Sequence, residues 1–497
     1  MISEEIVRRE RLTAIRAADV EPYPAESHRT MMAQAVLDAF DELVANGKEV
    51  ILCGRIRAIR KHGGLTFLEL QDESNTMQIV LRRDDLGIEP YEAFHRLADI
   101  GDFYEVMGAA YLTNRGEKSV LVTNTRLLTK TLLPLPEKFH GLQDTEKRYR
   151  YRYLDLLTNP EAKRMALMRS RMVACIRRFL EEEGFLEVET PILQAIAGGA
   201  NARPFKTRHN TLHHDFYLRI APELYLKRLL VGGFEKIYEY ARCFRNEGVS
   251  QQHNPEFTQI ELYWAYANIE GLMAHLERLL QRVNKEILEE KPMQFGDQAV
   301  SFSFPLPRTS FHDLVEKHTG IDVDLFDTED KLREEIERIG LRTEGVIGVG
   351  DLLDHLYKER VRPKIIAPQF VIDYPIALKP LAKARADKRY SSCAQLLING
   401  MEVWNAFNEL NDPLEQEERF REQEALRERG SEDAQRVDED FLNALKHGMP
   451  PAAGYGLGID RLAMLLCGAD NLKEVILFPT LKPSDNLLEH EDAQSPM

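Results

Sequence analysis

Cysteine is scarce and scattered in this chain. Its five cysteines form no C-x-x-C pair and have no histidines at zinc-binding spacing beside them, which argues against a disulfide framework and a structural zinc site. The sequence has no run of about 18 apolar residues, so a transmembrane helix is excluded and no membrane partner is expected. A G-x-x-x-x-G-K-[ST] motif is also missing, so a P-loop is not the phosphate site.

Positive charge is in deficit. The 497 residues include 65 Lys+Arg against 81 Asp+Glu, a formal charge of −16, which argues against a protein that coats nucleic acid by bulk attraction. The first residues, MISEEIVRRERL, lack the apolar stretch of an export signal, and we therefore expect a cytoplasmic protein. With 43% hydrophobic residues, the length allows two to four globular domains.

Short alternating segments rich in β-branched residues occupy residues 50–128, separated by turn residues such as Gly63-Gly64 and Asn114-Arg115-Gly116. Five strands at this spacing predict a small barrel, either an OB-fold or an SH3-like or other small β-domain. Residues 3–18 before it have the pattern of a solvated helix that ends at EPYP, and the later charged stretch 414–440 predicts another solvated helix without chemistry.

Residues 165–183 space their apolar side chains three or four apart, which predicts a helix capped by Gly184, and FLEVETP after it predicts a strand. If residues 257–265 form a strand, Phe257, Gln259, Glu261 and Tyr263 share one face. That face carries an aromatic ring and three hydrogen-bonding groups. It is either the exposed face of an antiparallel sheet or the wall of a ligand pocket.

Two C-terminal stretches also carry candidate chemistry. Alternating glycines in GYGLGIDR lead into an apolar helix with Arg461 in its first turn, which suits either close packing or a phosphate. In residues 395–412 strict alternation places Glu402 opposite Asn405, Phe407 and Glu409. We expect a bend or bulge near Asn405-Ala406 if these groups converge; otherwise the segment is an ordinary strand edge.

Three segments resemble, in order, the signature motifs of class II aminoacyl-tRNA synthetases: the helix with GFLEVETP, then FRNEG…HNPEFT, then GLGIDR. The wording FRNEG-x4-HNPEFT-x2-E-x-Y, together with GGANARPF, APELYLKRL and NELND, is similar to the lysyl-tRNA synthetase family. The resemblance spans about residues 1–483 and favours the OB-fold for the barrel.

The resemblance implies an α+β fold: a five-stranded OB-fold barrel that reads the anticodon, and a class II catalytic domain whose six-stranded antiparallel sheet is flanked by helices. It implies a homodimer that joins L-lysine to tRNA(Lys) with ATP through a lysyl-adenylate. We expect a helical extension at 1–48, the barrel at 49–135, a linker at 136–150, the catalytic domain at 151–486 and a disordered tail at 487–497.

The resemblance also implies roles for single residues. Arg245 and Arg461 are the expected catalytic groups. ATP is expected to contact Arg245, Glu247, His253, Phe257, Glu402 and Arg461. Lysine is expected to contact Gly199, Glu223, Arg245, Glu261, Tyr263, Asn405, Phe407 and Glu409. These groups suit the chemistry, because the enzyme must align two anions, and because a desolvated carboxylate rejects side chains that leave it unpaired.

Mg²⁺ is the expected cofactor, with Glu402 as its ligand. The family has a second acidic ligand seven residues earlier, where this chain has Gln395, so the number of ions is an open question. Trp404, Ala406 and Asn408 replace small residues around Asn405, and we expect them to change the shape of the pocket.

In the barrel, Phe67, Gln78 and Glu117 match the family's anticodon contacts, and an aromatic platform with amide and carboxylate groups suits single-stranded RNA. Taken alone, Phe67 is better explained as a core aromatic, but the OB-fold context and the matching positions favour the RNA contact. Four cations could contact the RNA backbone: Arg55, Arg57, Arg60 and Lys61.

Three alternatives to a lysine–tRNA ligase remain: an aspartyl or asparaginyl enzyme, a lysylating paralogue with a protein or other acceptor, and a catalytically inactive tRNA-binding protein. Glu409 argues against the first, because an acidic substrate needs a cation there. The anticodon domain argues against the second. The joint presence of Arg245, Glu247, Phe257 and Arg461 argues against the third.

Overall fold

The computed structural model describes residues 3–136, 141–200, 202–326, 328–379, 382–386, 388–428 and 437–483, without side chains at 426–428. The chain forms two compact units, residues 1–143 and 144–497. The segment 487–497, predicted to be a disordered tail, lies outside the described residues. Of the predicted linker, residues 137–140 also lie outside them, whereas α6 (Thr145–Arg150) is helical.

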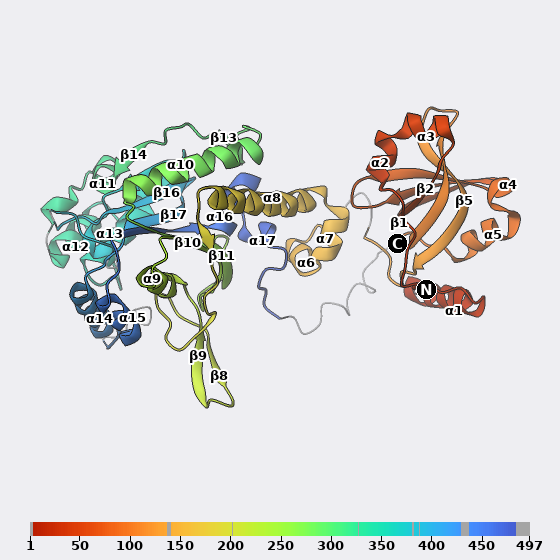
Figure 1. The fold of residues 1–497 in the computed structure, drawn as a ribbon. Coiled ribbons are helices and arrows are strands. Elements are labelled where there is room, and N and C mark those ends of the chain that lie inside the picture. The colour runs from red at the N-terminus through yellow and green to blue at the C-terminus, as the bar shows by residue number, and fades with distance from the viewer. Residues whose placement is uncertain are drawn as a thin grey trace. The chain divides into compact units, whose positions relative to one another are not determined.

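The first unit is a closed five-stranded barrel (Figure 1). The strands are β1 (Glu49–His62), β2 (Leu65–Gln71), β3 (Thr76–Arg82), β4 (Phe103–Leu112) and β5 (Lys118–Thr129), in the order β1-β2-β3-β5-β4. The β3–β5 pair is parallel and the others are antiparallel. Two short helices connect β3 to β4: α4 (Arg83–Leu86) and α5 (Ile88–Leu97). The predicted OB-fold barrel is therefore confirmed.

Three helices precede the barrel: α1 (Glu4–Ala17), α2 (Ala33–Asp38) and α3 (Phe40–Asn46). They share one hydrophobic core with it, because Ile15, Val36 and Phe40 are buried against barrel residues. The helix predicted over residues 3–18 exists, but the prediction that it is solvated on all sides is wrong, because one face of α1 is buried. The Arg8 guanidinium on that face is buried and donates to the Thr131 hydroxyl at 2.8 Å.

The second unit is built on an eight-stranded sheet. Its strand order is β14 (Arg308–Ser310), β15 (Gln369–Ile372), β16 (Cys393–Ile398), β17 (Met401–Asn408), β18 (Ala452–Gly458), β11 (Glu256–Ala265), β10 (Lys236–Phe244) and β6 (Leu186–Glu187). The six inner strands are antiparallel, as expected, and the short edge strands β14 and β6 pair in parallel. The strand predicted from FLEVETP is thus only two residues long.

Three helices cover one face of this sheet and form the main core with it: α8 (Pro160–Glu182), α10 (Ile269–Glu286) and α16 (Ile459–Cys467) (Figure 1). The predicted helix at 165–183 corresponds to α8. Asn159 accepts from the Glu161 amide at its start, and Gly184 follows its end with φ +81°, a conformation that glycine adopts without strain.

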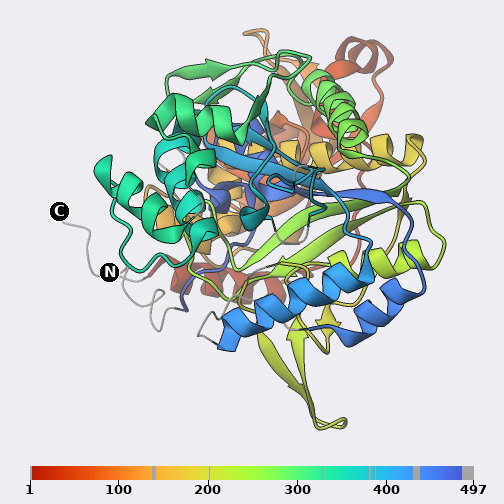
Figure 2. The same ribbon diagram turned by 90° about the vertical axis from the view of Figure 1, so that its left-hand side faces the viewer.

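The remaining elements surround the sheet. One group of helices packs around a separate hydrophobic core: α11 (Phe311–Thr319), α12 (Glu329–Arg338), α13 (Val349–Leu356) and a π-helical turn, Tyr357–Val361. A second hydrophobic core lies between α9 (Glu223–Val231), α14 (Pro413–Glu428) and α15 (Glu439–Lys446) (Figure 2). Phe420 of α14 is buried there, so the predicted solvated helix has one packed face.

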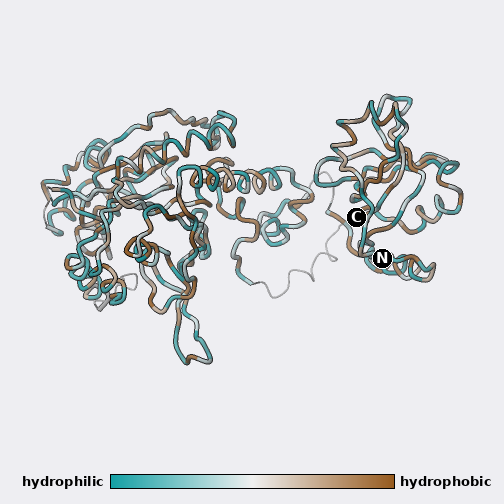
Figure 3. The backbone as a smooth tube through the Cα atoms, viewed as in Figure 1, coloured by the Kyte–Doolittle hydropathy of each residue, from teal (hydrophilic) through white to brown (hydrophobic). Residues whose placement is uncertain are grey.

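A three-stranded sheet, β7 (Leu193–Gln194), β9 (His214–Leu218) and β8 (Lys206–His209), contains the β8–β9 hairpin, which projects from the second unit and is mainly hydrophilic (Figures 1 and 3). Short elements complete the unit: α7 (Arg152–Thr158), α17 (Leu472–Val475), the hairpin β12 (Met293–Phe295)–β13 (Gln298–Val300), and 3₁₀ turns at Val323–Leu325, Arg362–Lys364 and Ile376–Leu378. Within the described ranges no helix is long and apolar enough to cross a membrane.

The His275 imidazole of α10 is fully buried in the main core. Rings of Phe179 and Phe185 lie 5.2 Å from it between centroids, and neither ring nitrogen has a hydrogen-bond partner among the described residues. Burial lowers the pKa of His275 from 6.5 to about 4. The folded protein therefore holds this imidazole neutral.

We predict that His275 makes the protein lose stability as the pH falls from about 6.5 toward 4, because the unfolded chain then binds a proton that the folded chain excludes. The His275→Phe variant is expected to lose about 2 kcal/mol less between pH 7 and pH 5 than the parent protein. Urea unfolding at both pH values measures this difference. The exposed His447, changed to Gln, is the control, and equal losses in parent and His275→Phe would refute the prediction.

Candidate active site

A cavity of about 280 Å³ lies on the sheet face opposite α8, α10 and α16. Strands β11, β17 and β18 form its floor. It brings together nearly all the residues predicted to contact ATP or lysine: Gly199, Glu223, Arg245, Glu247, His253, Phe257, Glu261, Tyr263, Glu402, Asn405, Phe407 and Arg461. The exception is Glu409, which is 1% exposed and lies behind the cavity wall.

The pairing of β11 with β18 forms the floor of the cavity. Phe257, Gln259, Glu261 and Tyr263 all face the cavity, so their shared face is a pocket wall rather than an exposed sheet face. Glycines lie opposite three of them in the antiparallel register: Gly458, Gly456 and Gly454. The alternating glycines thus leave the space above the strand open.

Two of these glycines differ in how much space a side chain would find. A Cβ at Gly454 would lie 2.6 Å from the Tyr263 ring and would clash with the Glu409 carboxylate, so only glycine fits there. A Cβ at Gly456 would meet nothing within 4 Å, because that glycine borders the cavity itself.

One end of the cavity is cationic. Arg461, in the first turn of α16, donates to the Glu402 carbonyl at 3.0 Å and contacts His253 Nε2 at 3.2 Å. Burial, with Arg461 and Arg245 close by, lowers the pKa of His253, so the neutral ring can accept that hydrogen bond. The Arg245 guanidinium lies 5.0 Å from the Phe257 ring centroid and has no carboxylate partner among the described residues. This end suits an anionic group beside a planar ring.

The other end is acidic, and a residue without a predicted role, Lys227, is buried behind its wall. Its ammonium lies 2.6 Å from Glu223 Oε1 and 2.6 Å from Glu409 Oε2, and all three side chains are buried. Burial alone would lower the pKa of Lys227, but the two carboxylates outweigh it and raise that pKa. The spacing of Glu223 and Lys227, four residues apart on one helix, was the available sequence signal.

Glu261 adds a third buried carboxylate. Gln259 donates to it at 2.5 Å, and the Tyr263 hydroxyl lies 3.4 Å from it. Burial, with Glu223 and Glu239 nearby, raises the pKa of Glu261 well above its usual range. Three carboxylates against one ammonium leave this end short of positive charge, so a ligand with a cationic group would be stabilised here.

Glu402 reaches the cavity through a bulge in β17. Leu396 pairs with Trp404 and Leu397 with Glu402, so Val403 is the extra residue. The bulge predicted near Asn405-Ala406 therefore exists two residues earlier. It brings Glu402 to the same face as Asn405 and Phe407.

The residues expected to reshape the pocket do not line it. Trp404 and Ala406 are fully buried in the core on the other face, and the Asn408 side chain accepts from the Ile269 amide at 2.9 Å, at the start of α10. The expectation that they alter the pocket directly is therefore wrong, because strand alternation places them on the helix side of the sheet, opposite Asn405 and Phe407.

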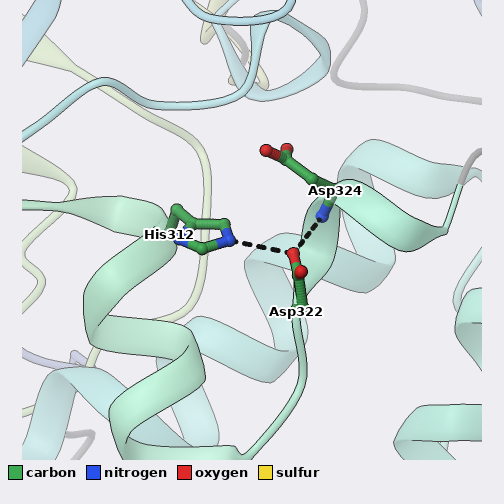
Figure 4. A group of neighbouring side chains, drawn as sticks. All are labelled: His312, Asp322 and Asp324. Carbon is green, nitrogen blue, oxygen red and sulfur yellow. Dashed lines mark hydrogen bonds and ion pairs between the residues drawn. The ribbon is translucent and has the colours of Figure 1, made fainter.

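Only one group in the described part of the chain has three clustered histidine or carboxylate ligand atoms, within 4.8 Å: His312, Asp322 and Asp324 (Figure 4). Asp322 Oδ1 already accepts from His312 Nε2 at 2.9 Å and from the Asp324 amide at 3.0 Å, and Asp324 accepts from Tyr390. Hydrogen bonding to Asp322 raises the pKa of His312. The three side chains therefore form an ion-pair and hydrogen-bond network that explains their proximity without a metal ion.

In the barrel, Phe67 is half-buried on β2, where the core positions are its neighbours Leu68 and Leu70. A core role for Phe67 is therefore excluded. Gln78 donates to Ser119 Oγ at 3.0 Å, and Glu117 is exposed two residues before Ser119. The predicted contacts thus lie on the outer surface of neighbouring strands.

The cations near this surface are partly engaged within the unit. Arg55 donates to the Gly101 carbonyl at 3.0 Å and Arg60 to Glu69. Lys61 lies 3.9 Å from Glu92.

Two parts of the chain match known families. Residues 144–482 match the tRNA synthetases class II (D, K and N), and residues 50–128 match the OB-fold nucleic acid binding domain. The fold, the cavity and these matches define the class: a class II tRNA synthetase with an attached OB-fold.

Curated proteins named lysine–tRNA ligase are similar to almost the whole chain. The Moorella thermoacetica protein is 46% identical over 480 residues, covering 96% of this chain and 98% of its own length. The Dehalococcoides mccartyi protein is 46% identical over 488 residues, 97% and 98% of the two chains, and the Roseiflexus castenholzii protein is 46% identical over 477 residues, 96% and 98%. Within its class the chain therefore belongs to the lysine–tRNA ligase family.

We predict that Lys227→Met lowers the free energy of unfolding by about 3–5 kcal/mol, because it leaves Glu223 and Glu409 buried and facing each other without a cation. Chemical denaturation near pH 7 measures the loss. Lys291→Met, at an exposed lysine that pairs only with exposed Glu289, is the matched control. A Lys227→Met protein as stable as this control would show that the bridge is not needed for the fold.

Proposed function

We propose that this protein is a lysine–tRNA ligase: it activates L-lysine with ATP to lysyl-adenylate and pyrophosphate, and transfers the lysyl group to the 3′-terminal adenosine of tRNA(Lys). One observation carries the proposal. A single cavity has a cationic end, where Arg245 has no carboxylate partner among the described residues, and an acidic end lined by Glu223 and Glu261. Glu409 and the Lys227 ammonium are buried behind the wall of the acidic end. Such a cavity fits a nucleotide at one end and a doubly cationic amino acid at the other.

ATP occupies the cationic end in this proposal. Its adenine stacks on Phe257 with Arg461 on the other side, and Glu247 accepts from the adenine amino group. Arg245 binds the α-phosphate together with the substrate carboxylate, while Arg461 and His253 lie near the outer phosphates. Mg²⁺ bound with ATP would neutralise phosphate charge, and Glu402 is the carboxylate that would hold it.

Lysine occupies the acidic end. Glu223 and the Gly199 backbone hold its α-ammonium, and Asn405 lies near its carboxylate. Glu261, Tyr263, Phe407 and Glu409 enclose the ε-ammonium.

Lys227 refines this assignment, because it already occupies one oxygen each of Glu223 and Glu409. It fixes both carboxylates, and Glu409 Oε1, beside Gly454, is left without a hydrogen-bond partner among the described residues, so it can accept from a substrate ammonium. A shorter or uncharged amino acid leaves this oxygen unpaired and is rejected.

The reaction needs no nucleophile from the protein, since the substrate carboxylate attacks the α-phosphate itself. Arg245 has no competing ion pair with any described residue, so its guanidinium can bind both reacting anions and reduce their repulsion as the bond to the α-phosphate forms. Pyrophosphate then leaves toward Arg461 and His253. Asp460 connects the start of α16 to β11 and α8 at this end, because it accepts from the Thr258 amide at 2.7 Å and pairs with Arg169 at 2.6 Å.

A homodimer and a cytoplasmic location complete the proposal. Apolar side chains in the segment that follows α8 along the chain are exposed on the single chain, among them Leu186 (51%), Ile192 (43%) and Leu193 (50%). Burying them against a second copy would remove this apolar area from water.

The proposal predicts lysine-dependent exchange of label between pyrophosphate and ATP, because adenylate formation is reversible, with no comparable rate for the other nineteen amino acids. The same preparation is expected to attach lysine to tRNA(Lys). Exchange without transfer to tRNA would favour a lysylating protein with another acceptor. Absence of exchange with every amino acid would overturn the ligase assignment and leave an inactive tRNA-binding protein.

In the barrel, the proposal predicts that Phe67→Ala raises the KM for tRNA(Lys) about tenfold or more, as expected when one stacked base loses its aromatic platform. The rate of lysine-dependent exchange stays unchanged, since that step does not need tRNA. Aminoacylation kinetics with purified tRNA measures both. Ile88→Ala, at a side chain of the same unit that is 70% exposed, is the control. An unchanged KM would remove Phe67 from the anticodon site.

A further inference from the structure

The Glu402 side chain is hydrogen-bonded to a neutral amide on the adjacent strand. Gln395 Nε2 donates to Glu402 Oε2 at 2.7 Å and to Asn405 Oδ1 at 3.1 Å. The Tyr374 hydroxyl donates to Gln395 Oε1 at 2.6 Å, and Tyr357 lies behind it at 3.2 Å between hydroxyl oxygens. Gln395 and both tyrosines are almost fully buried, so this chain of contacts is closed to water on one side.

The orientation of the Gln395 amide follows from charge. An ionised carboxylate can only accept hydrogen bonds, so the nitrogen of the amide must face Glu402. Both of its protons are then used, and its oxygen faces the buried Tyr374 hydroxyl. Gln395 therefore presents no oxygen to a metal ion beside Glu402.

A cation completes the cluster. The Lys379 ammonium lies 3.3 Å from Asn405 Oδ1 and 5.1 Å from the Tyr374 ring centroid. Asn405 thus accepts from Gln395 on one side and from Lys379 on the other. With one carboxylate and one ammonium the cluster is formally neutral, whereas two carboxylates without a lysine would carry two negative charges. Divalent ions such as Mg²⁺ bind where carboxylate charge accumulates.

We infer that Gln395 removes a second divalent-ion site beside Glu402, and that the Lys379 ammonium supplies the positive charge which a second ion would bring. The ATP complex of this protein then holds one divalent ion, on Glu402. The inference rests on the proposed function, because ATP is the ligand whose phosphates require this charge. Gln395 is a positioning residue in this account: it orients Glu402 and Asn405 without contacting the nucleotide.

The test counts bound Mn²⁺, a substitute for Mg²⁺, by electron paramagnetic resonance of the free ion, with saturating β,γ-methylene ATP. The unaltered protein is expected to bind one Mn²⁺ per chain. Gln395→Glu is expected to bind two, because it places a second carboxylate beside Glu402. Gln298→Glu, which adds the same charge at an exposed position of β13, is expected to bind one. Two ions in the unaltered protein, or one in a folded Gln395→Glu variant, would overturn the inference.

Lys379 is tested separately. Lys379→Met is expected to raise the KM for ATP about tenfold, because it removes a positive charge close to Glu402 and the phosphates, and to shift the Mg²⁺ optimum of the exchange reaction upward. Lys317→Met, at an exposed lysine of α11, is the control. A Lys379→Met protein with unchanged KM and Mg²⁺ optimum would contradict the role of this ammonium.

The two levels of failure can be told apart. Lysine-dependent exchange by the unaltered protein tests the proposed function alone. Normal exchange together with two bound Mn²⁺ ions would refute only the inference about Gln395 and Lys379.

Discussion

The antiparallel register between β11 and β18 is the constraint on which the site depends. It places a glycine opposite Gln259, Glu261 and Tyr263, so polar side chains of one strand lie over open space created by the other. The same alternation sends Ile260 and Leu262 into the core under α8, α10 and α16. One pairing therefore produces both the hydrophobic layer that stabilises the sheet and the polar floor of the cavity.

Charge is separated along this floor. Arg245 and Arg461 lie at one end, while Glu223, Glu261 and Glu409 lie at the other. Buried like charges repel strongly, and Lys227 makes the acidic end tolerable because it bridges two of the three carboxylates. The remaining imbalance is what a doubly cationic amino acid can correct. The acidity of the whole chain thus includes a small, buried part that is suited to recognise a substrate.

The sequence predicted much of this site, because β-strand alternation and the spacing of the motifs place residue types on faces. The pocket face of β11 and the helix carrying Arg461 follow from such local rules. Two features of the site were not predicted correctly from the sequence. The bulge falls at Val403 rather than at Asn405-Ala406, and it brings Glu402 to the face of Asn405. The ion pair of Lys227 with Glu409 was missed, because Glu409 lies 182 positions away along the chain and only the end of β17 brings it to α9. The pair with Glu223, four residues away, was visible as spacing on one helix.

By itself, the sequence predicted a five-stranded barrel and the polar face of residues 257–265, because both follow from residue type and spacing within single segments. Through its resemblance to a known family it also indicated the OB-fold, the other pocket residues and the acid expected at the position of Gln395. Only the tertiary structure decided how Gln395 orients its amide, which carboxylates Lys227 bridges and where Lys379 places its ammonium. Those outcomes depend on distances of a few ångströms between strands and helices far apart in sequence, because hydrogen bonds and buried ion pairs act only at contact range.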